Sequence, residues 1–202
     1  MQMMKSQILR RIDRMPQGTV FSPKDFLDIA SRGTVDVTLS SLVNEGRIRR
    51  IRRGLYDVPR HNPELGGDLA PDIDGAARTL ARKNRWKIVP DKAWAANLLG
   101  ISTQVPAKIV YLSDGPSKEV QIGRRTVSFK HARPSMLAGL DTKTGLVVQA
   151  IRDLGKDHIG PAEIRRLRSQ LSAAEKRKLV KETRYSVAWV YEAARQIAGD
   201  KG

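Results

Sequence analysis

The chain has 202 residues, of which 40% are hydrophobic and 29% are charged, a composition typical of a folded, water-soluble protein. It contains no cysteine, which excludes disulfides, thiol catalysis and cysteine-ligated metals. Its 37 lysines and arginines outnumber its 21 acidic residues, and the resulting formal charge of +16 favours an anionic partner, most commonly nucleic acid.

No apolar run approaches the roughly 20 residues that a membrane-spanning helix needs. The N-terminal segment lacks the apolar region of a signal peptide, so we do not expect secretion. Together with the absence of cysteine, these features predict a cytoplasmic protein with no membrane partner.

Three short helical patterns are predicted before the first strongly basic segment. Apolar residues at helical spacing predict an amphipathic helix over 4–15 and a second helix over 23–30, with Ser22 as the N-cap of the second. Thr34 is the predicted N-cap of the third helix, and Gly46 is its predicted end. Two short helices joined by a glycine-containing turn are typical of a helix-turn-helix.

The segment "GRIRRIRRGLYDVP", residues 46–59, carries five arginines and is called here the basic hairpin. We expect strands over 47–51 and 55–58, joined by a turn at 52–54. Ile48 and Ile51 are three residues apart, so strict alternation fails and a β-bulge is implied. Helix, helix-turn-helix and hairpin is the order of a winged helix-turn-helix, which we predict for residues 1–60.

The outer side of the third helix is predicted to lack long charged side chains, so that it can approach DNA bases closely. The arginines of the basic hairpin would then bind phosphates, which fix position rather than read sequence. In the alternative interpretation, the winged helix makes only protein contacts and the arginines are solvated. The predicted DNA-binding residues are Thr34, Val37, Thr38, Ser41, Asn44, Arg47, Arg49, Arg50, Arg52 and Arg53.

Residues 61–202 are predicted to form a basic, mixed α+β domain with a helical C-terminal tail, so the whole chain is expected to be α+β. A proline- and glycine-rich linker over 60–72 comes first, followed by helix and strand patterns. A second predicted hairpin with basic residues spans 118–133, and only helices are predicted after Thr142. The basic surfaces of this domain are candidates for contact with a toxin or nucleic acid, or are simply solvated. The residues concerned are Arg124, Arg125, Lys130, Arg165, Arg166 and Arg168.

No catalytic, metal or cofactor site is predicted. The three histidines lie in separate contexts without metal-ligand spacing, and His158 beside Asp157 does not favour a dyad, because adjacent side chains seldom face each other. The acidic "DID" at 72–74 is explained by its place at a helix start. We therefore do not expect an enzyme.

The segment "TVFSPKDFLDIASRGTVDVTLSSLVNEGRIRRIRRGLYDVP" resembles the N-terminal winged helix of the AbiEi-type antitoxins of bacterial abortive-infection systems. The matching features are "F-S-P-x-D-F", "L-x-x-E-G-x-I" and "R-x-R-R-G-L-Y". The resemblance implies an antitoxin that represses its own promoter by binding inverted repeats in double-stranded DNA and counteracts a nucleotidyltransferase-like toxin encoded beside it. It places Thr38, Ser41 and Asn44 on the recognition helix and Arg49, Arg50, Arg52 and Arg53 on the wing.

Two other functions compete with this hypothesis. The first is a protein-interaction module that sequesters an acidic toxin directly, with DNA binding secondary. The second is an RNA-binding factor, which the few aromatic residues (four tyrosines, three phenylalanines and three tryptophans) do not favour, because RNA binders stack bases on exposed rings.

Overall fold

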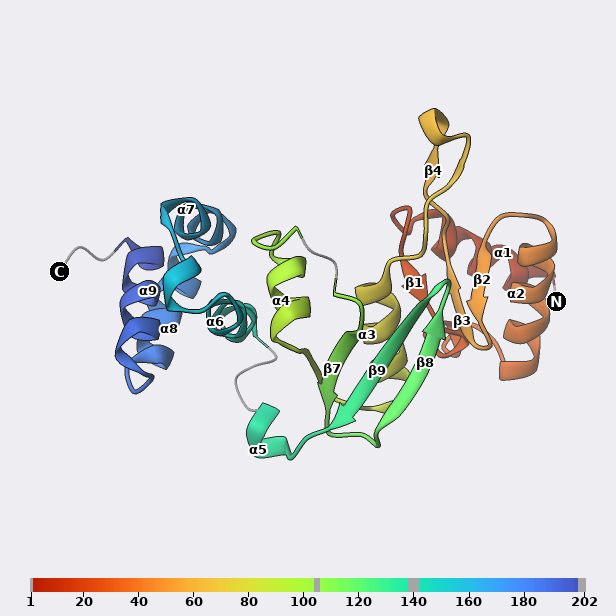
Figure 1. Cartoon of the computed structure of the whole chain (residues 1–202). Helices are drawn as coiled ribbons and strands as arrows, with labels where there is room; N and C mark the ends of the chain where they lie inside the picture. The colour runs from red at the N-terminus through yellow and green to blue at the C-terminus, as the bar shows by residue number, and fades with distance from the viewer. Residues whose placement is uncertain (1, 104–105, 138–141, 200–202) are drawn as a thin grey trace. The chain divides into compact units, whose positions relative to one another are not determined.

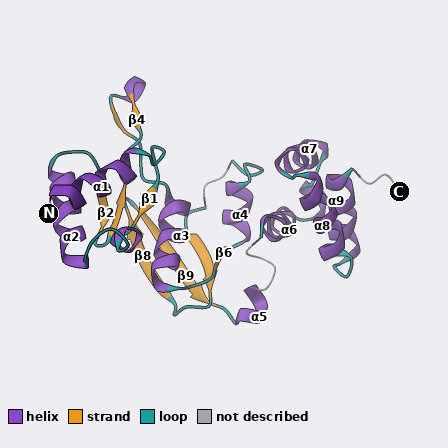
Figure 2. Ribbon diagram, turned by 180° about the vertical axis from the view of Figure 1, so that it is seen from behind, coloured by secondary structure: helices purple, strands orange, loops and turns teal. Residues whose placement is uncertain are grey.

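The computed structural model describes residues 2–103, 106–137 and 142–199. The chain is mixed α+β and ends in a series of helices, which confirms the predicted fold class at this level (Figures 1 and 2). It divides into two compact units, residues 1–86 with 120–127 and residues 87–119 with 128–202.

The first unit combines two α-helices of the N-terminal region with a three-stranded antiparallel sheet in the order β1-β3-β2. A short β4–β5 hairpin lies in the segment predicted as a linker. The elements are α1 (Gln2–Asp13), β1 (Val20–Phe21), the 3₁₀ helix η1 (Pro23–Phe26), α2 (Arg32–Asn44), β2 (Arg49–Arg52), β3 (Leu55–Asp57), β4 (His61–Asn62), the 3₁₀ helix η2 (Pro63–Leu65), β5 (Gly67–Asp68) and α3 (Ile73–Asn84).

The second predicted helix is shorter than expected. A 3₁₀ helix replaces the α-helix predicted over 23–30, although Ser22 does precede it and Pro23 is its first residue. The Asp25 carboxylate accepts the backbone N–H of Ser22 at 2.8 Å and so holds this first turn. Hydrogen-bonded turns then lead to Ala30, and Ser31 caps the next helix.

The ends of α2 are set by local capping. Ser31, not Thr34, is the N-cap: its Oγ accepts the backbone N–H of Thr34 at 3.4 Å. Gly46 follows the C-cap with a φ of +69°, as predicted. The N–H of Gly46 donates to the carbonyl of Val43 and that of Arg47 to the carbonyl of Leu42, which is the Schellman arrangement.

The basic hairpin forms as predicted, with its turn at Arg53 and Gly54. Gly54 has a φ of +74°, which a side chain would strain. The register shifts between Arg50 and Arg52, so the expected bulge is present at Ile51.

The core of the N-terminal part lies between α1, α2 and the sheet. Phe21 packs edge-on against Phe26, with ring centroids 5.5 Å apart, and stacks on Tyr56 at 6.0 Å. Three strands are too few to be stable in water alone, so this packing supports the sheet. The buried side chains are Ile8, Ile12, Phe21, Phe26, Ala30, Val35, Leu39, Leu42, Ile48 and Tyr56.

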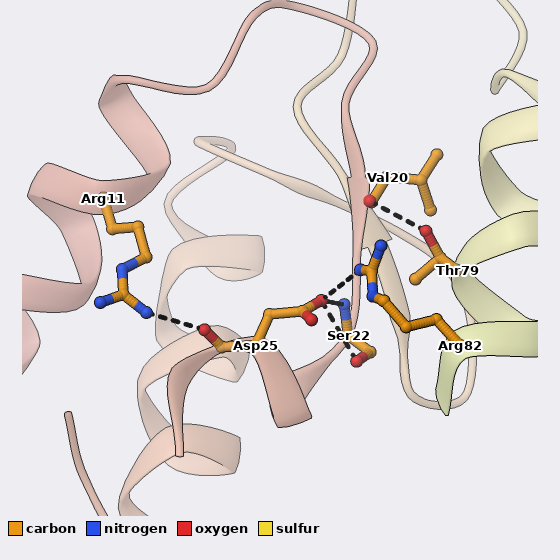
Figure 3. A network of polar contacts seen from close by, with 6 residues as sticks. All are labelled: Arg11, Val20, Ser22, Asp25, Thr79 and Arg82. Carbon is orange, nitrogen blue, oxygen red and sulfur yellow. Dashed lines mark hydrogen bonds and ion pairs between the residues drawn. The ribbon is translucent and has the colours of Figure 1, made fainter. Parts of the chain in front are cut away.

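The first unit extends past the predicted boundary at residue 60, because α3 packs on β1 and β3. The hydroxyl of Thr79 donates to the carbonyl of Val20 at 3.1 Å, and a guanidinium nitrogen of Arg82 lies 2.9 Å from the Asp25 carboxylate. Figure 3 shows both contacts converging on β1 and the start of η1. Residues 73–84 therefore belong to the N-terminal fold.

The second unit contains strands of a mixed sheet, in which β6 pairs antiparallel with β7, and a helical bundle. The four-stranded sheet has the order β6-β7-β9-β8, and the turn of the β8–β9 hairpin lies within residues 120–127, which belong to the first unit. The elements are β6 (Ile88–Pro90), α4 (Lys92–Leu98), β7 (Ile109–Ser113), β8 (Lys118–Ile122), β9 (Arg125–His131), α5 (Pro134–Leu137), α6 (Lys143–Leu154), the 3₁₀ helix η3 (Lys156–His158), α7 (Pro161–Gln170), α8 (Ala173–Thr183) and α9 (Ala188–Ala198).

The helices α4, α6, α7, α8 and α9 enclose one apolar core, which includes Val147, Ile151, Leu167, Leu179 and Ile197. The predicted capping box opens α8: Ser172 Oγ accepts the N–H of Glu175 at 3.3 Å, and the Glu175 carboxylate accepts the N–H of Ser172 at 2.8 Å. The buried indole of Trp94 donates a hydrogen bond to the Tyr111 hydroxyl at 2.7 Å.

Candidate nucleic-acid interface

One side of α2 is exposed along its whole length. Gly33, Val37, Ser40 and Asn44 lie four, three and four residues apart, so they share one helix face, and all are exposed. We call this face the exposed stripe of α2. Val37 is 67% exposed, which is unusual for a valine and leaves its methyl groups free for contact. The side chains of the stripe are short and uncharged, as expected for a surface that approaches base edges.

Thr38 does not belong to this face, contrary to the prediction. It is only 5% exposed, because it lies three residues after Val35 and four before Leu42, both of which are fully buried. The residue that the prediction omitted is Ser40, which follows Val37 by three positions and precedes Asn44 by four. Helical spacing alone would have found it.

Ser41 and Thr34 are also engaged within the fold. The Ser41 hydroxyl donates to the Glu45 carboxylate at 2.6 Å and accepts from the Lys5 ammonium at 3.0 Å. The hydrogen bond from Lys5, followed by that from Ser41, lowers the pKa of Glu45. The Thr34 hydroxyl lies 3.0 Å from that of Ser31 and completes the helix cap. Of the five predicted residues on α2, only Val37 and Asn44 are classed as exposed.

Two arginines of the basic hairpin are tied to acidic partners. Arg49 forms two hydrogen bonds to Asp57, at 2.6 and 3.1 Å, and a third to the carbonyl of Leu69 at 2.9 Å. The hydrogen bonds that Arg49 donates to Asp57 raise the pKa of Arg49. Arg47 lies 2.7 Å from the Asp13 carboxylate at the end of α1. These two guanidinium groups are therefore already neutralised by the protein.

The other three arginines have no ion-pair partner among the described residues. Arg50 and Arg53 are exposed, and Arg52 is half-buried. Nη1 of Arg52 is buried and donates no hydrogen bond to any side chain or carbonyl of the described residues. Arg50, Arg52 and Arg53 therefore remain candidates for phosphate binding, whereas Arg49 stabilises the hairpin through Asp57.

The predicted basic residues of the C-terminal half separate in the same way. Arg124, Arg125 and Lys130 are exposed on the β8–β9 hairpin, and Arg165 is exposed on α7. Arg168 instead donates to the carbonyls of Gln196 and Ile197 at the end of α9.

Arg166 likewise donates to the carbonyl of Gly100. Cationic groups at a helix end stabilise the unpaired carbonyls there, as Arg168 does at α9. Both Arg166 and Arg168 therefore have structural contacts within the second unit.

In the part of the chain that the structure describes, no three histidine or acidic side chains come together as a metal site. The Asp72 carboxylate caps α3 by accepting the N–H of Asp74 at 3.1 Å, which is the structural role predicted for the "DID" segment. None of the described helices has the length and apolar character that crossing a bilayer requires.

The chain belongs to a protein family described as a family of unknown function, DUF6088, whose model matches residues 7–179. The match covers most of both units. No curated protein matches the chain.

Proposed function

We propose that the N-terminal part is a winged helix-turn-helix that binds double-stranded DNA. The order of helices and strands and the sheet order β1-β3-β2 support this assignment, since the hairpin β2–β3 then serves as the wing and α2 as the recognition helix. The net charge of +16 supports an anionic ligand.

One observation carries the proposal: free cations and short uncharged side chains are sorted onto adjacent elements. The exposed stripe of α2 carries no charge, while the hairpin that follows it carries the unpaired Arg50, Arg52 and Arg53. In protein–DNA complexes, arginines on phosphates set the register, and side chains in the major groove read the bases. A merely solvated basic surface has no reason for this division.

We further propose that the chain is a DNA-binding antitoxin that represses its own promoter. The resemblance of residues 19–59 to AbiEi-type antitoxins supports this role. The partner would be a nucleotidyltransferase-like toxin encoded by the adjacent gene, and the operator would contain inverted repeats.

The experiment has a binding arm and a cellular arm. A gel shift with the DNA upstream of the gene is expected to show binding that weakens steeply with salt. A reporter driven by the same DNA is expected to be repressed by the wild-type chain. Cells that express the adjacent gene, which would encode the toxin, are expected to regain growth when the wild-type chain is co-expressed. Absence of binding to that DNA at low salt would refute the DNA-binding proposal, and failure to restore growth would refute the antitoxin role.

A second candidate function is direct sequestration of an acidic partner protein through the helical bundle. It is favoured by exposed cations on and just after α8, Arg177, Lys181 and Arg184, beside Tyr185, which is 93% exposed. Exposed aromatic and arginine side chains are enriched in protein interfaces. Co-purification with the product of the adjacent gene, lost on Tyr185→Ala with Arg184→Ala, would support this function over DNA binding alone.

A further inference from the structure

The C-terminal end of α3 is fixed against η1 and β1. Besides the bonds from Thr79 and Arg82, the ammonium of Lys24 donates to the carbonyl of Lys83 at 2.8 Å. Thr79, Arg82 and Lys83 lie in the last two turns of α3, so these contacts set both the rotation and the end of the helix. Figure 3 shows the contacts of Thr79 and Arg82. Lys83 is thereby held in a defined place.

The ammonium of Lys83 lies against the turn of the basic hairpin. A methyl group on Gly54 would be only 2.7 Å from Nζ of Lys83, so the absence of a side chain at Gly54 makes room for this cation. Gly54 directly follows Arg52 and Arg53, so the Lys83 ammonium lies close to these arginines. Nothing in the sequence near residue 83 signals this contact.

Lys83 is surrounded by charges of its own sign. Partial burial lowers its pKa most, and the positive charges of Arg32, Arg52, Lys24 and Arg53 lower it further. No acidic side chain is among the groups that shift it. We call Lys24, Arg32, Arg52, Arg53 and Lys83 the cation cluster.

Arg52, Arg53 and Lys83 have no ion-pair partner among the described residues. Nη1 of Arg52 is buried without a hydrogen-bond acceptor. Arg32 is paired through Nε to Asp36, at 2.8 Å, and Lys24 binds only a carbonyl. Leaving a buried donor unpaired destabilises the fold, and repulsion between the cations adds to that cost.

We propose that the cation cluster is a binding site for a phosphate group. A phosphate offers several acceptor oxygens and a negative charge, so it would satisfy Arg52 and offset the repulsion around Lys83 in one step. The phosphate is either part of a duplex backbone or a free anion. The first of these sources rests on the proposed function. Either source extends the site from the hairpin to α3.

The first arm of the test measures duplex binding by fluorescence anisotropy as a function of salt. The variants are Lys83→Gln and Arg52→Gln, and the matched control is Lys108→Gln, which removes the same charge from an exposed lysine of the second unit. Each variant in the cluster is expected to lower the salt slope of duplex binding by about one. Between 50 and 200 mM salt, its affinity should therefore fall by a factor about threefold smaller than that of wild type. The control is expected to keep the wild-type slope.

The second arm uses inorganic phosphate without DNA. Phosphate is expected to raise the melting temperature of the wild-type chain relative to chloride at equal ionic strength, and Lys83→Gln is expected to lose most of that rise. Because Lys83→Gln removes repulsion, we expect it to fold and to melt no lower than wild type without phosphate. A phosphate response shared equally by the control and by Lys83→Gln would count against the site.

The two arms separate failure of the site from failure of the proposed function. If wild type binds the duplex but both cluster variants keep its salt slope and its phosphate response, the site is refuted and DNA binding stands. If wild type binds no duplex but shows the phosphate response that Lys83→Gln loses, the site holds for a free anion and DNA binding is refuted. If neither duplex nor phosphate acts on wild type, both are refuted.

Discussion

Arg49 and Asp57 face each other directly across the β2–β3 pair and form a two-bond ion pair, with Nη2 and Oδ2 2.6 Å apart. The Asp57 side chain is 1% exposed and that of Arg49 is 29% exposed. This pair lies within a segment of five arginines, and it assigns one of them to the fold rather than to a ligand. Arg50, the next residue, is exposed and unpaired among the described residues.

We predict that Arg49→Ala destabilises the protein by about 3 kcal/mol, because it leaves the Asp57 carboxylate buried without a counter-charge. Urea unfolding followed by circular dichroism measures the change. Arg50→Ala is the matched control and is expected to change the free energy of unfolding by less than about 0.5 kcal/mol. Equal stability of the two variants would contradict the structural role of Arg49.

The exposed arginines of the hairpin are predicted to act on affinity rather than on stability. Arg50→Ala combined with Arg53→Ala is expected to reduce the salt slope of duplex binding by about one for each lost phosphate contact. Binding to all sequences should weaken by a similar factor, since phosphates carry no base identity. A variant that loses affinity for one sequence only would show that these side chains read bases.

Substitutions in the exposed stripe of α2 are expected to change sequence discrimination rather than the salt slope. Asn44→Ala is expected to reduce discrimination between the upstream DNA and a shuffled duplex by about 1–3 kcal/mol, with little change in salt slope, because an amide reads a base edge. Ser40→Ala and Ser41→Ala provide a matched comparison. Only Ser40→Ala is expected to affect discrimination, since the Ser41 hydroxyl is bound to Glu45 and Lys5. If Ser41→Ala has the larger effect, the face is wrongly assigned.

Periodicity and capping signals predicted most elements of the N-terminal part, although the N-cap of α2 and the length of the second helix were wrong. Gly46, the bulge at Ile51 and the Ser172 capping box follow from local backbone rules, and the structure has all three. Thr38 was assigned to the wrong face although its spacing from Val35 was readable, because its polarity was weighed above its position.

The division of the arginines could not be read from the sequence. Arg49 and Arg50 are the same residue type in the same strand, and only the cross-strand position of Asp57 distinguishes them. Lys83 follows Gly54 by 29 residues and reaches it because α3 packs on β1 and β3. Such contacts depend on tertiary structure, which local patterns do not contain.

The cation cluster also predicts a pH dependence of stability. Lys83 has a pKa below its ordinary value of 10.5, because of burial and of the charges on Arg32, Arg52, Lys24 and Arg53. Between the lowered pKa and 10.5, the unfolded chain binds more protons than the folded chain, so the free energy of unfolding should rise with pH.

We expect Lys83→Gln to be more stable than wild type near pH 7, with the difference shrinking as the pH approaches 10.5. Thermal unfolding of both chains over this range measures the effect, and salt is expected to reduce it by screening the exposed members of the cluster. A wild-type chain that is the more stable of the two near pH 7 would contradict repulsion at Lys83.

We propose that α2 reads DNA sequence while the basic hairpin binds the phosphate backbone. Competition between the duplex upstream of the gene and a shuffled duplex of equal length and composition, at 150 mM salt, tests this division. The upstream duplex is expected to bind at least about a hundredfold more tightly, and Asn44→Ala is expected to narrow this ratio. Equal affinity for the two duplexes would contradict this division.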